Sequence, residues 1–286
     1  MQTIIDKRDL AIGVFDSGMG GLTVLKSLRE HMPDESYVYL GDTARLPYGT
    51  KSPQTVAAYA MQMTKILQTK AVKCIVIACN TATTAALPYL QEIFPEIPIV
   101  GVVEPSAKAA IANTRNAKIT VLATETTIRS GIYQNTIAKL APEIHVETQS
   151  CGLFVALAEE GCVDDDIAYA VVKKYLQPLQ QALEGPGCVI LGCTHFPVLI
   201  EPLRQLLGDK ICIVDSAEAT AKRVKQILTQ QQLLSAPNQA SSAQFLVSDS
   251  PERFARLGQL FFGEAIAEKS IQLIDAQNSH FEGSRV

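Results

Sequence analysis

The chain has 286 residues, of which 47% are hydrophobic and 19% are charged, and its formal net charge is −4. This composition indicates a soluble globular protein with enough core for one large α/β domain or two ordinary ones. The negative charge and the lack of a Lys/Arg stripe interleaved with aromatic residues argue against binding to nucleic acid.

No apolar run reaches the length of about 18 residues that suggests a membrane span, and the N-terminus lacks the apolar core of a signal peptide. We therefore expect a cytoplasmic protein with no membrane contact. The seven cysteines, an odd number, are expected to be free thiols in a reducing compartment.

The first predicted strand, Ala11 to Phe15, leads into a glycine-rich turn, residues 16–21, and then into a helix. The turn matches neither of the phosphate-binding patterns GxGxxG and GxxxxGKS/T, and an acidic residue at its head would repel an anion. Asp16 therefore suits a substrate ammonium group or a proton relay. Capping of the helix by Asp16 or Ser17 is the alternative.

The second predicted strand, Tyr37 to Gly41, is followed by a loop, Asp42 to Thr50, that shows no periodicity. Ser52 and Pro53 then supply an N-cap and a first-turn proline for a helix that runs to about Gln68. The loop at the C-terminal end of this strand is either a lid over a site or a plain surface connection.

An apolar run, Lys73 to Ala78, ends abruptly in Cys79, Asn80 and Thr81, and a helical pattern follows from Ala82 to Ile93. In open α/β sheets the turn from a strand into a helix is where ligands bind. A thiol at a helix N-terminus also feels the positive end of the helix dipole, which favours the reactive thiolate. We therefore expect a functional site at Cys79.

The next strands are expected at Ile97 to Val102 and at Ala117 to Ala123, with a helix starting at Glu104 between them. The second of these strands ends in a hydroxyl-rich turn, residues 124–130. Such hydroxyl groups can hydrogen-bond a carboxylate without adding net charge, and an ordinary helix cap is the alternative.

The pattern of the first cysteine strand returns between Cys188 and His195, with the same Cys-x4-Cys spacing and again a small residue before the second cysteine, Cys193. A helical pattern again follows, from Pro197 to Leu207. Cys188 and its counterpart Cys74 lie inside the strands and are expected to be core residues.

The remaining elements are predicted from periodicity and turn signals. They are a strand at His145 to Thr148, a helix at Asp164 to Leu183, a strand at Ile211 to Asp215, a helix at Ala217 to about Leu233, a polar linker at Leu233 to Ser242, a strand at Gln244 to Ser248, a helix at Pro251 to Phe262 and a frayed end from Gln272 to Val286.

The two halves of the chain have the same order of elements. Residues 12–15 correspond to 119–122, residues 74–81 to 188–195, and residues 97–100 to 211–214. We infer an internal duplication and predict two similar α/β units, each with a Cys at a strand end. A ligand between two facing halves would meet one thiol from each side.

Two facing thiols permit several kinds of chemistry. Cys79, Cys193, His195 and Asp16 could ligate zinc, but no CxxC or HxxxH spacing supports a metal site. A Cys–His hydrolase is a second alternative, although the short separation of Cys193 and His195 suits tuning of the thiol better than base catalysis. Proton transfer at a carbon, with one Cys on each face, uses both thiols and amounts to racemisation without a cofactor.

These motifs resemble those of the glutamate racemases, in the aspartate/glutamate racemase family, over nearly the full length of the chain. The matching residues are Phe15 to Thr23, Gly41-Asp42 with Pro47-Tyr48-Gly49, Ala78 to Thr81, Thr124 and Thr127 with Ser130 and Tyr133, and Leu191 to His195. Aspartate racemases share the two-cysteine plan, but the glycine-rich head and the Pro-Tyr-Gly loop resemble the glutamate enzymes. An aspartate racemase and a non-catalytic glutamate-binding protein are the alternatives.

The resemblance implies roles for individual residues. Cys79 would act on the D enantiomer and Cys193 on the L enantiomer, as base and acid, with Asp16, His195 and Glu159 as further catalytic residues. The residues implied in substrate binding are Asp16, Ser17, Pro47, Tyr48, Gly49, Asn80, Thr81, Thr124, Thr127, Thr194 and His195.

The resemblance also implies a domain division and a biological role. It implies an α/β fold of two similar doubly wound domains with the active site between them. A discontinuous first domain would take residues 1–103 and 216–286, and the second would take residues 104–215. Glutamate is the implied small-molecule partner, with no metal or other cofactor, and a homodimer is compatible with the family. The implied role is supply of D-glutamate for peptidoglycan. Gly152 and Ala156 stand where the family often has prolines, which leaves the placing of Glu159 open.

Overall fold

The computed structural model describes residues 6–179 and 187–276. Its strands are β1 (Ala11–Asp16), β2 (Tyr37–Gly41), β3 (Val72–Ile77), β4 (Ile99–Gly101), β5 (Lys118–Ala123), β6 (His145–Ser150), β7 (Cys188–Gly192), β8 (Cys212–Asp215), β9 (Ala243–Val247) and β10 (Ile271–Leu273). Its α-helices are α1 (Leu22–His31), α2 (Pro53–Thr69), α3 (Asn80–Ile93), α4 (Val103–Asn113), α5 (Glu125–Arg129), α6 (Ile132–Leu140), α7 (Gly152–Glu160), α8 (Asp166–Leu176), α9 (Ile200–Leu207), α10 (Ser216–Gln230) and α11 (Pro251–Phe262). Short 3₁₀ helices are η1 (Lys7–Asp9), η2 (Tyr48–Thr50), η3 (Gln177–Leu179), η4 (Phe196–Leu199) and η5 (Glu268–Ser270).

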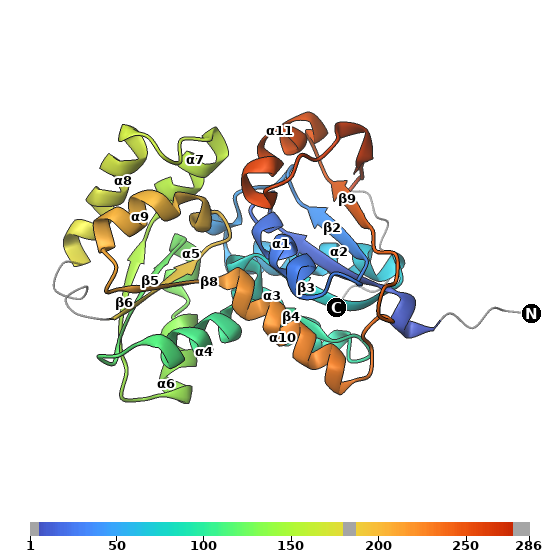
Figure 1. Ribbon diagram of the computed structural model, residues 1–286, viewed down its shortest axis with the longest axis horizontal. Coiled ribbons are helices and arrows are strands. Elements are labelled where there is room, and N and C mark those ends of the chain that lie inside the picture. Colours follow the sequence, from blue (N-terminus) through green and yellow to red (C-terminus); the bar gives the residue numbers. More distant parts are fainter. Residues whose placement is uncertain (1–5, 180–186, 277–286) are drawn as a thin grey trace, which may run out of the picture.

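Two parallel sheets form the centres of two lobes (Figure 1). The first sheet has the strand order β10-β9-β2-β1-β3-β4, and the second has the order β6-β5-β7-β8. The four strands β2-β1-β3-β4 therefore have the same arrangement as β6-β5-β7-β8, strand for strand. The predicted fold class of two similar doubly wound α/β halves is confirmed.

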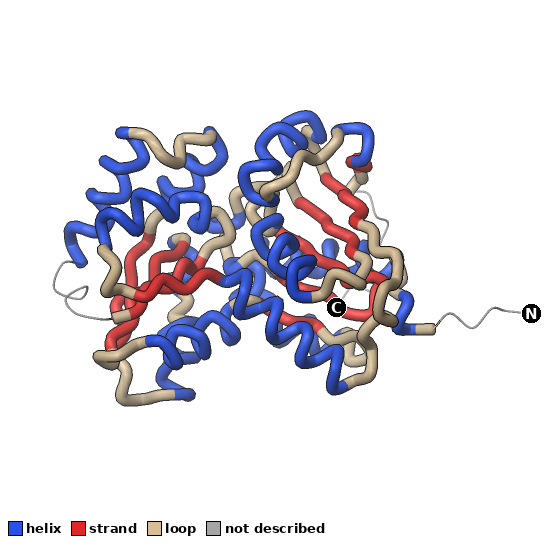
Figure 2. The backbone as a smooth tube through the Cα atoms, viewed as in Figure 1, coloured by secondary structure: helices blue, strands red, loops and turns tan. Residues whose placement is uncertain are grey.

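Helices cover both faces of each sheet (Figure 2). On the first sheet, α1, α10 and α11 pack on one face and α2 and α3 on the other. On the second sheet, α7, α8 and α9 pack on one face and α4 and α6 on the other. Strands β2, β3 and β7 are buried along their whole length. Burial on both faces explains why these segments are continuous apolar runs in the sequence.

Local capping sets the start of two of these helices. Helix α2 begins after Ser52, whose hydroxyl accepts a hydrogen bond from the Thr55 N–H (3.3 Å), and Pro53 occupies its first position. Helix α10 begins after Asp215, whose carboxylate accepts a hydrogen bond from the Ala217 N–H (2.8 Å). None of the helices in the described part of the chain is both long and apolar enough to cross a membrane.

The helix predicted from Asp164 to Leu183 is wrong in its extent. Helix α8 ends at Leu176 and continues only as the 3₁₀ turn η3, while residues 180–183 lie outside the described residues. Pro178 has no N–H to donate to the carbonyl four residues earlier, and this missing hydrogen bond accounts for the end of the α-helix even though Gln177 keeps helical backbone angles.

The C-terminal segment expected to be frayed, Gln272 to Val286, includes part of a strand. Residues 271–273 form β10, which pairs in parallel with β9, and residues 277–286 lie outside the described residues. The open edge of β9 supplies the backbone partners, and so short a strand leaves no periodicity in the sequence.

The carboxyl ends of β1 and β3 face those of β5 and β7. The Thr194 hydroxyl, after β7, donates to Asp16 at the end of β1 (3.3 Å), and the Thr81 and Thr124 hydroxyl oxygens are 3.0 Å apart. A cluster of buried polar side chains, with Asp16 and Thr81 from the first half and Thr124 and Thr194 from the second, therefore lies between the two sheets. Strands β9 and β10 join the first sheet from the C-terminal part of the chain. The domain boundaries at residues 103/104 and 215/216 stay a prediction.

Candidate active site

Cys79 caps helix α3. Its sulfur accepts a hydrogen bond from the Ala82 N–H (3.4 Å), so it lies at the positive end of a 14-residue helix. The helix starts slightly earlier than the sequence predicts, so Asn80 and Thr81 lie in its first turn. Burial, followed by the negative charge of Asp16, raises the pKa of Cys79 to about 12. This sulfur is therefore a thiol at neutral pH.

Cys193 enters a different turn. The segment after it is the 3₁₀ helix η4, and α9 begins only at Ile200. The helix predicted from Pro197 is therefore wrong in its first turn, and Cys193 does not lie at an α-helix N-terminus. The Phe196 N–H donates to the Cys193 carbonyl (3.1 Å), the i to i+3 pattern that tightens a turn into 3₁₀ geometry.

His195 links Cys193 to a buried carboxylate. Its Nδ1 lies 3.9 Å from the Cys193 sulfur, and its Nε2 lies 2.7 Å from Glu159 Oε1. Burial lowers the pKa of His195, but hydrogen bonds to Cys193 and Glu159 outweigh burial and raise it to about 10. The imidazole is therefore protonated at neutral pH and presents a positive charge to the sulfur. Glu159, whose placing the sequence left open, belongs to the cluster.

Asp16 connects the two cysteine turns. Its carboxylate is fully buried and accepts hydrogen bonds from the Gly18 N–H (3.0 Å) and the Thr194 hydroxyl (3.3 Å). Burial raises the pKa of Asp16, while the charge of His195 and the hydrogen bonds oppose the rise. The carboxylate thus acts electrostatically on Cys79 and on His195.

The glycine-rich turn after β1 allows this close approach. A Cβ added at Gly20 would lie 2.5 Å from His195 Nδ1 and 2.6 Å from Thr194 Oγ1. A Cβ at Gly21 would lie 2.5 Å from the Asp16 Cβ. The two glycines are therefore required by contact with the second cysteine turn and with Asp16, and not by a bound phosphate.

Three threonines join the two halves on the other side of the cluster. The Thr81 hydroxyl oxygen lies 3.0 Å from that of Thr124 and 3.2 Å from that of Thr127, and the last two are 3.1 Å apart. All three side chains are buried. They form a neutral group of donors that can hydrogen-bond a carboxylate.

Two residues of this polar network were not among the predicted site residues. The Tyr133 hydroxyl donates to Asn80 Oδ1 (2.7 Å), and the Asn80 amide donates to Ser216 Oγ (3.4 Å). Tyr133 belongs to the motif resemblance, but its helix shows no local signal of function. Ser216 directly follows the N-cap residue Asp215, and a serine at this position is ordinary in the first turn of a helix, so the sequence shows no signal of a functional role.

The loop after β2 packs across the two halves. The Tyr48 hydroxyl donates to Asp42, and the Thr126 hydroxyl donates to the Gly49 carbonyl (2.9 Å). Tyr48 and Gly49 are buried, whereas Pro47, also predicted to bind substrate, is exposed. The loop therefore covers one edge of the cluster. Ser17 lies beside Cys79 and is 7% exposed.

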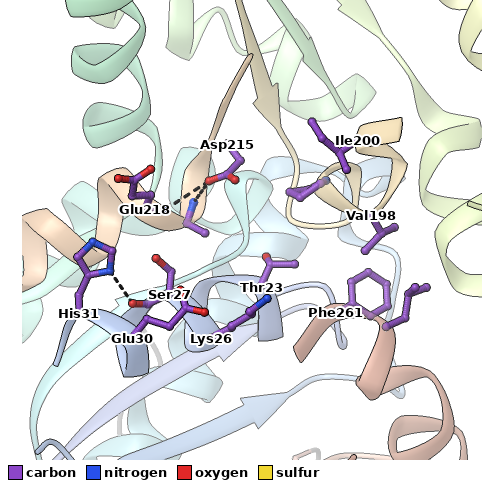
Figure 3. Close-up of a pocket in the computed structure, with 13 residues that line it drawn as sticks. Thr23, Lys26, Ser27, Glu30, His31, Val198, Ile200, Asp215, Glu218 and Phe261 are labelled. Atoms are coloured by element: carbon purple, nitrogen blue, oxygen red, sulfur yellow. Dashed lines mark hydrogen bonds between the residues drawn. The ribbon is translucent and has the colours of Figure 1, made fainter. Parts of the chain in front are cut away.

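In the described ranges, no three His, Cys, Asp or Glu side chains are grouped as metal ligands. A pocket of about 650 Å³ does lie near the cluster, between α1, η4 and the start of α10 (Figure 3). None of the predicted site residues lines it. It adjoins the second cysteine turn through Thr23, whose hydroxyl contacts the Thr194 carbonyl (3.4 Å).

The fold and the cluster define a two-lobed α/β protein with one buried thiol from each lobe, the first beside Asp16 and the second beside the His195–Glu159 pair. The model of the Asp/Glu/Hydantoin racemase family matches residues 21–224. The chain belongs to that family, and the resemblance of its motifs is confirmed.

Several glutamate racemases are similar to this chain over about nine-tenths of its length. A glutamate racemase of Geobacter metallireducens is 44% identical over 258 residues, which cover 90% of this chain and 94% of the relative. The crystal structure of a glutamate racemase from Bacillus anthracis has a TM-score of 0.88 at 34% identity and covers 94% of this chain and 98% of its own. The Francisella tularensis glutamate racemase in complex with D-glutamate has a TM-score of 0.86 at 34% identity, covering 94% and 99%.

Proposed function

We propose that this protein interconverts L-glutamate and D-glutamate, with Cys79 and Cys193 as the acid–base pair. The observation that carries the proposal is that two buried thiols, one from each half, are near enough to interact electrostatically and have surroundings that differ in charge. The choice of glutamate is supported by the names of relatives that match nine-tenths of the chain. Their names favour glutamate over aspartate.

The two thiols have surroundings of different charge. The pKa of about 12 keeps Cys79 as a thiol. The His195 Nδ1 lies 3.9 Å from the Cys193 sulfur, where the imidazolium stabilises the negative charge that this sulfur carries when it acts as the base. The Cys193 thiolate removes the Cα proton of L-glutamate, and the electron pair of that bond remains on the carbanionic Cα. The Cys79 thiol then donates its proton to the opposite face, which yields D-glutamate.

The reverse reaction uses the same two sulfurs with their charges exchanged. Cys79 becomes the base, and the His195–Cys193 pair supplies the proton. The hydroxyl groups of Ser17, Thr81, Thr124, Thr127 and Thr194, with the Asn80 amide, bind the substrate carboxylates and stabilise the negative charge of the transition state. Asp16 and the covering Tyr48–Gly49 segment complete the substrate site.

Substrate entry requires the two halves to move apart. Cys79 is 6% exposed and Cys193 is 8% exposed, so neither sulfur can meet a substrate in this closed arrangement. Closure around glutamate then excludes water from the carbanion. In a bacterial cytoplasm this activity supplies D-glutamate for peptidoglycan.

The test is racemisation in heavy water. With L-glutamate, early D-glutamate carries deuterium at Cα while remaining L-glutamate stays largely protiated, because the proton delivered by Cys79 comes from solvent. Retention of the original Cα proton in early product rejects the two-base mechanism. Binding of glutamate by calorimetry without turnover rejects the enzyme. The same assay on aspartate, and after dialysis against a chelator, checks the substrate and the independence from metal.

A further inference from the structure

Glu159 has one oxygen that the cluster described so far does not use. Its Oε1 bonds His195, but its Oε2 is buried and has no hydrogen-bond partner among the described residues. A buried carboxylate oxygen without a partner is costly, so a neighbouring charge is needed to hold it in place. Arg253 supplies that charge: its Nη2 lies 3.3 Å from Glu159 Oε2 and donates to the Glu159 backbone carbonyl, also at 3.3 Å.

Arg253 reaches this carboxylate from the other half of the molecule. It lies in the first turn of α11, which packs on the first sheet, whereas Glu159 lies near the end of α7, on the second sheet. The same helix contacts His195, because the Phe261 ring lies edge-on to the imidazole with centroids 5.4 Å apart. Helix α11 therefore contacts both His195 and Glu159, the pair that lies beside Cys193.

Two other charged groups lie near this contact, Glu160 and Asp16, and as carboxylates they cannot supply the positive charge that Arg253 brings to Glu159. Glu160 Oε1 is 3.7 Å from Arg253, but its side chain is 75% exposed, so that ion pair is worth little. Asp16 acts electrostatically on His195 from the end of β1 and has no ion pair with Arg253 among the described residues. Within the described residues, Arg253 and the His195 imidazolium are the cations in contact with Glu159, and Arg253 is the one next to Oε2.

We propose that Arg253 is a positioning residue for Cys193: it holds the Glu159 carboxylate against His195 and thereby keeps the imidazolium next to the Cys193 sulfur. This inference rests on the proposed racemisation. It adds a fourth residue, Arg253 from the other half, to the chain of contacts that joins Cys193 to His195 and His195 to Glu159. Separation of the halves breaks the contact between Arg253 and Glu159. The His195–Glu159 pair is therefore held in position beside Cys193 only when the two halves are closed.

The test compares R253Q with R256Q, a matched loss of charge on the same helix at an exposed residue. We expect R253Q to lower kcat/KM roughly tenfold, as loss of a residue that orients a reactive group does. The fall is equal in both directions because the enantiomers are equally stable. R253K restores most of the activity, R256Q stays near wild type, and thermal melting verifies that both variants fold.

Isotope effects separate this role from a general loss of packing. If R253Q slows proton transfer at Cys193, the primary effect with Cα-deuterated L-glutamate rises, and the effect with Cα-deuterated D-glutamate falls. A structural defect without preference for one thiol does not produce opposite changes. In an E159Q background R253Q adds little, because Arg253 acts through Glu159. Unchanged isotope effects or additive losses overturn the proposal.

Imidazole NMR tests the same contact without turnover. The chain has only four histidines, so the proton on His195 Nε2 can be assigned by its loss in H195N. We expect this proton to be protected from solvent in wild type, R253K and R256Q, and to exchange rapidly in R253Q. Equal protection in R253Q overturns the inference even if the wild type proves inactive, which would reject the proposed function alone.

Discussion

The two cysteine turns have similar sequences and occupy equivalent positions in their sheets, yet they differ in charge and in backbone. Cys79 caps a long α-helix and lies beside a carboxylate, whereas Cys193 enters a short 3₁₀ turn and lies beside an imidazolium. A helix dipole favours a thiolate, but at Cys79 burial and Asp16 outweigh it. The comparison teaches that equivalent positions in two repeated halves can have opposite electrostatic surroundings, because their neighbours differ.

The largest expected effect is loss of either reactive thiol. Cys79→Ala and Cys193→Ala should each lower the rate of racemisation by more than about a thousandfold, since one base and one acid are needed for inversion. The measurement is optical rotation or chiral chromatography of product. Cys74→Ala and Cys188→Ala, at the equivalent buried strand positions, are the controls and should keep most of the activity. Near wild-type racemisation by Cys193→Ala would show that the reaction does not need both thiols.

The next effect concerns the contact between the glycine-rich turn and the second cysteine turn. Gly20→Ala forces a Cβ against His195 and Thr194 and should lower kcat about a hundredfold, because displacements of about 1 Å at a reactive group have costs of that size. Gly152→Ala, where a Cβ meets nothing within 4 Å, is the control. Equal activity of the two variants would show that the Gly20 contact does not position His195.

Alkylation rates compare the reactivity of the two thiols, Cys79 and Cys193, directly. At pH 7 we expect iodoacetamide to label Cys79 more than about tenfold more slowly than Cys193, because only thiolates react and the raised pKa of Cys79 leaves almost none of it as thiolate. Labelling of Cys79 should rise about tenfold per pH unit, since its pKa of about 12 lies above the whole accessible range. Peptide mass spectrometry gives both rates. His195→Asn should slow labelling at Cys193 alone, and faster labelling of Cys79 in the wild type would reverse the assignment.

The smallest expected effect lies in the covering loop. Tyr48→Phe removes the hydroxyl that bonds Asp42 and should change kcat or KM by about fivefold, as loosened lid contacts do. Tyr48→Ala should have a larger effect, because it also removes a buried ring. Steady-state kinetics in both directions provides the measurement, with Tyr59→Phe, the ring that packs on Tyr48, as control. No change in either constant for Tyr48→Ala would reject the loop as a cover for the site.

The sequence by itself determined the features that are local or repeated. Strand β2 and helix α11 have the bounds that their apolar runs and turn residues predict, and the repeated Cys-x4-Cys strands predicted two equivalent halves. Asp16, Cys79 and Cys193 could be found because each follows a buried strand, and the carboxyl ends of parallel strands collect at one edge of a sheet.

Only the tertiary structure decided how those features work together. The pKa values of Cys79 and His195 depend on burial and on neighbours distant in sequence, Asp16 for Cys79 and Glu159 for His195. Tyr133 and Arg253 carry no signal in their own helices, because their role is a contact with the opposite half. Strand β10 likewise exists because β9 offers an open edge. Spacing along a chain reports periodicity, whereas electrostatics and edge pairing depend on distances that the fold alone creates.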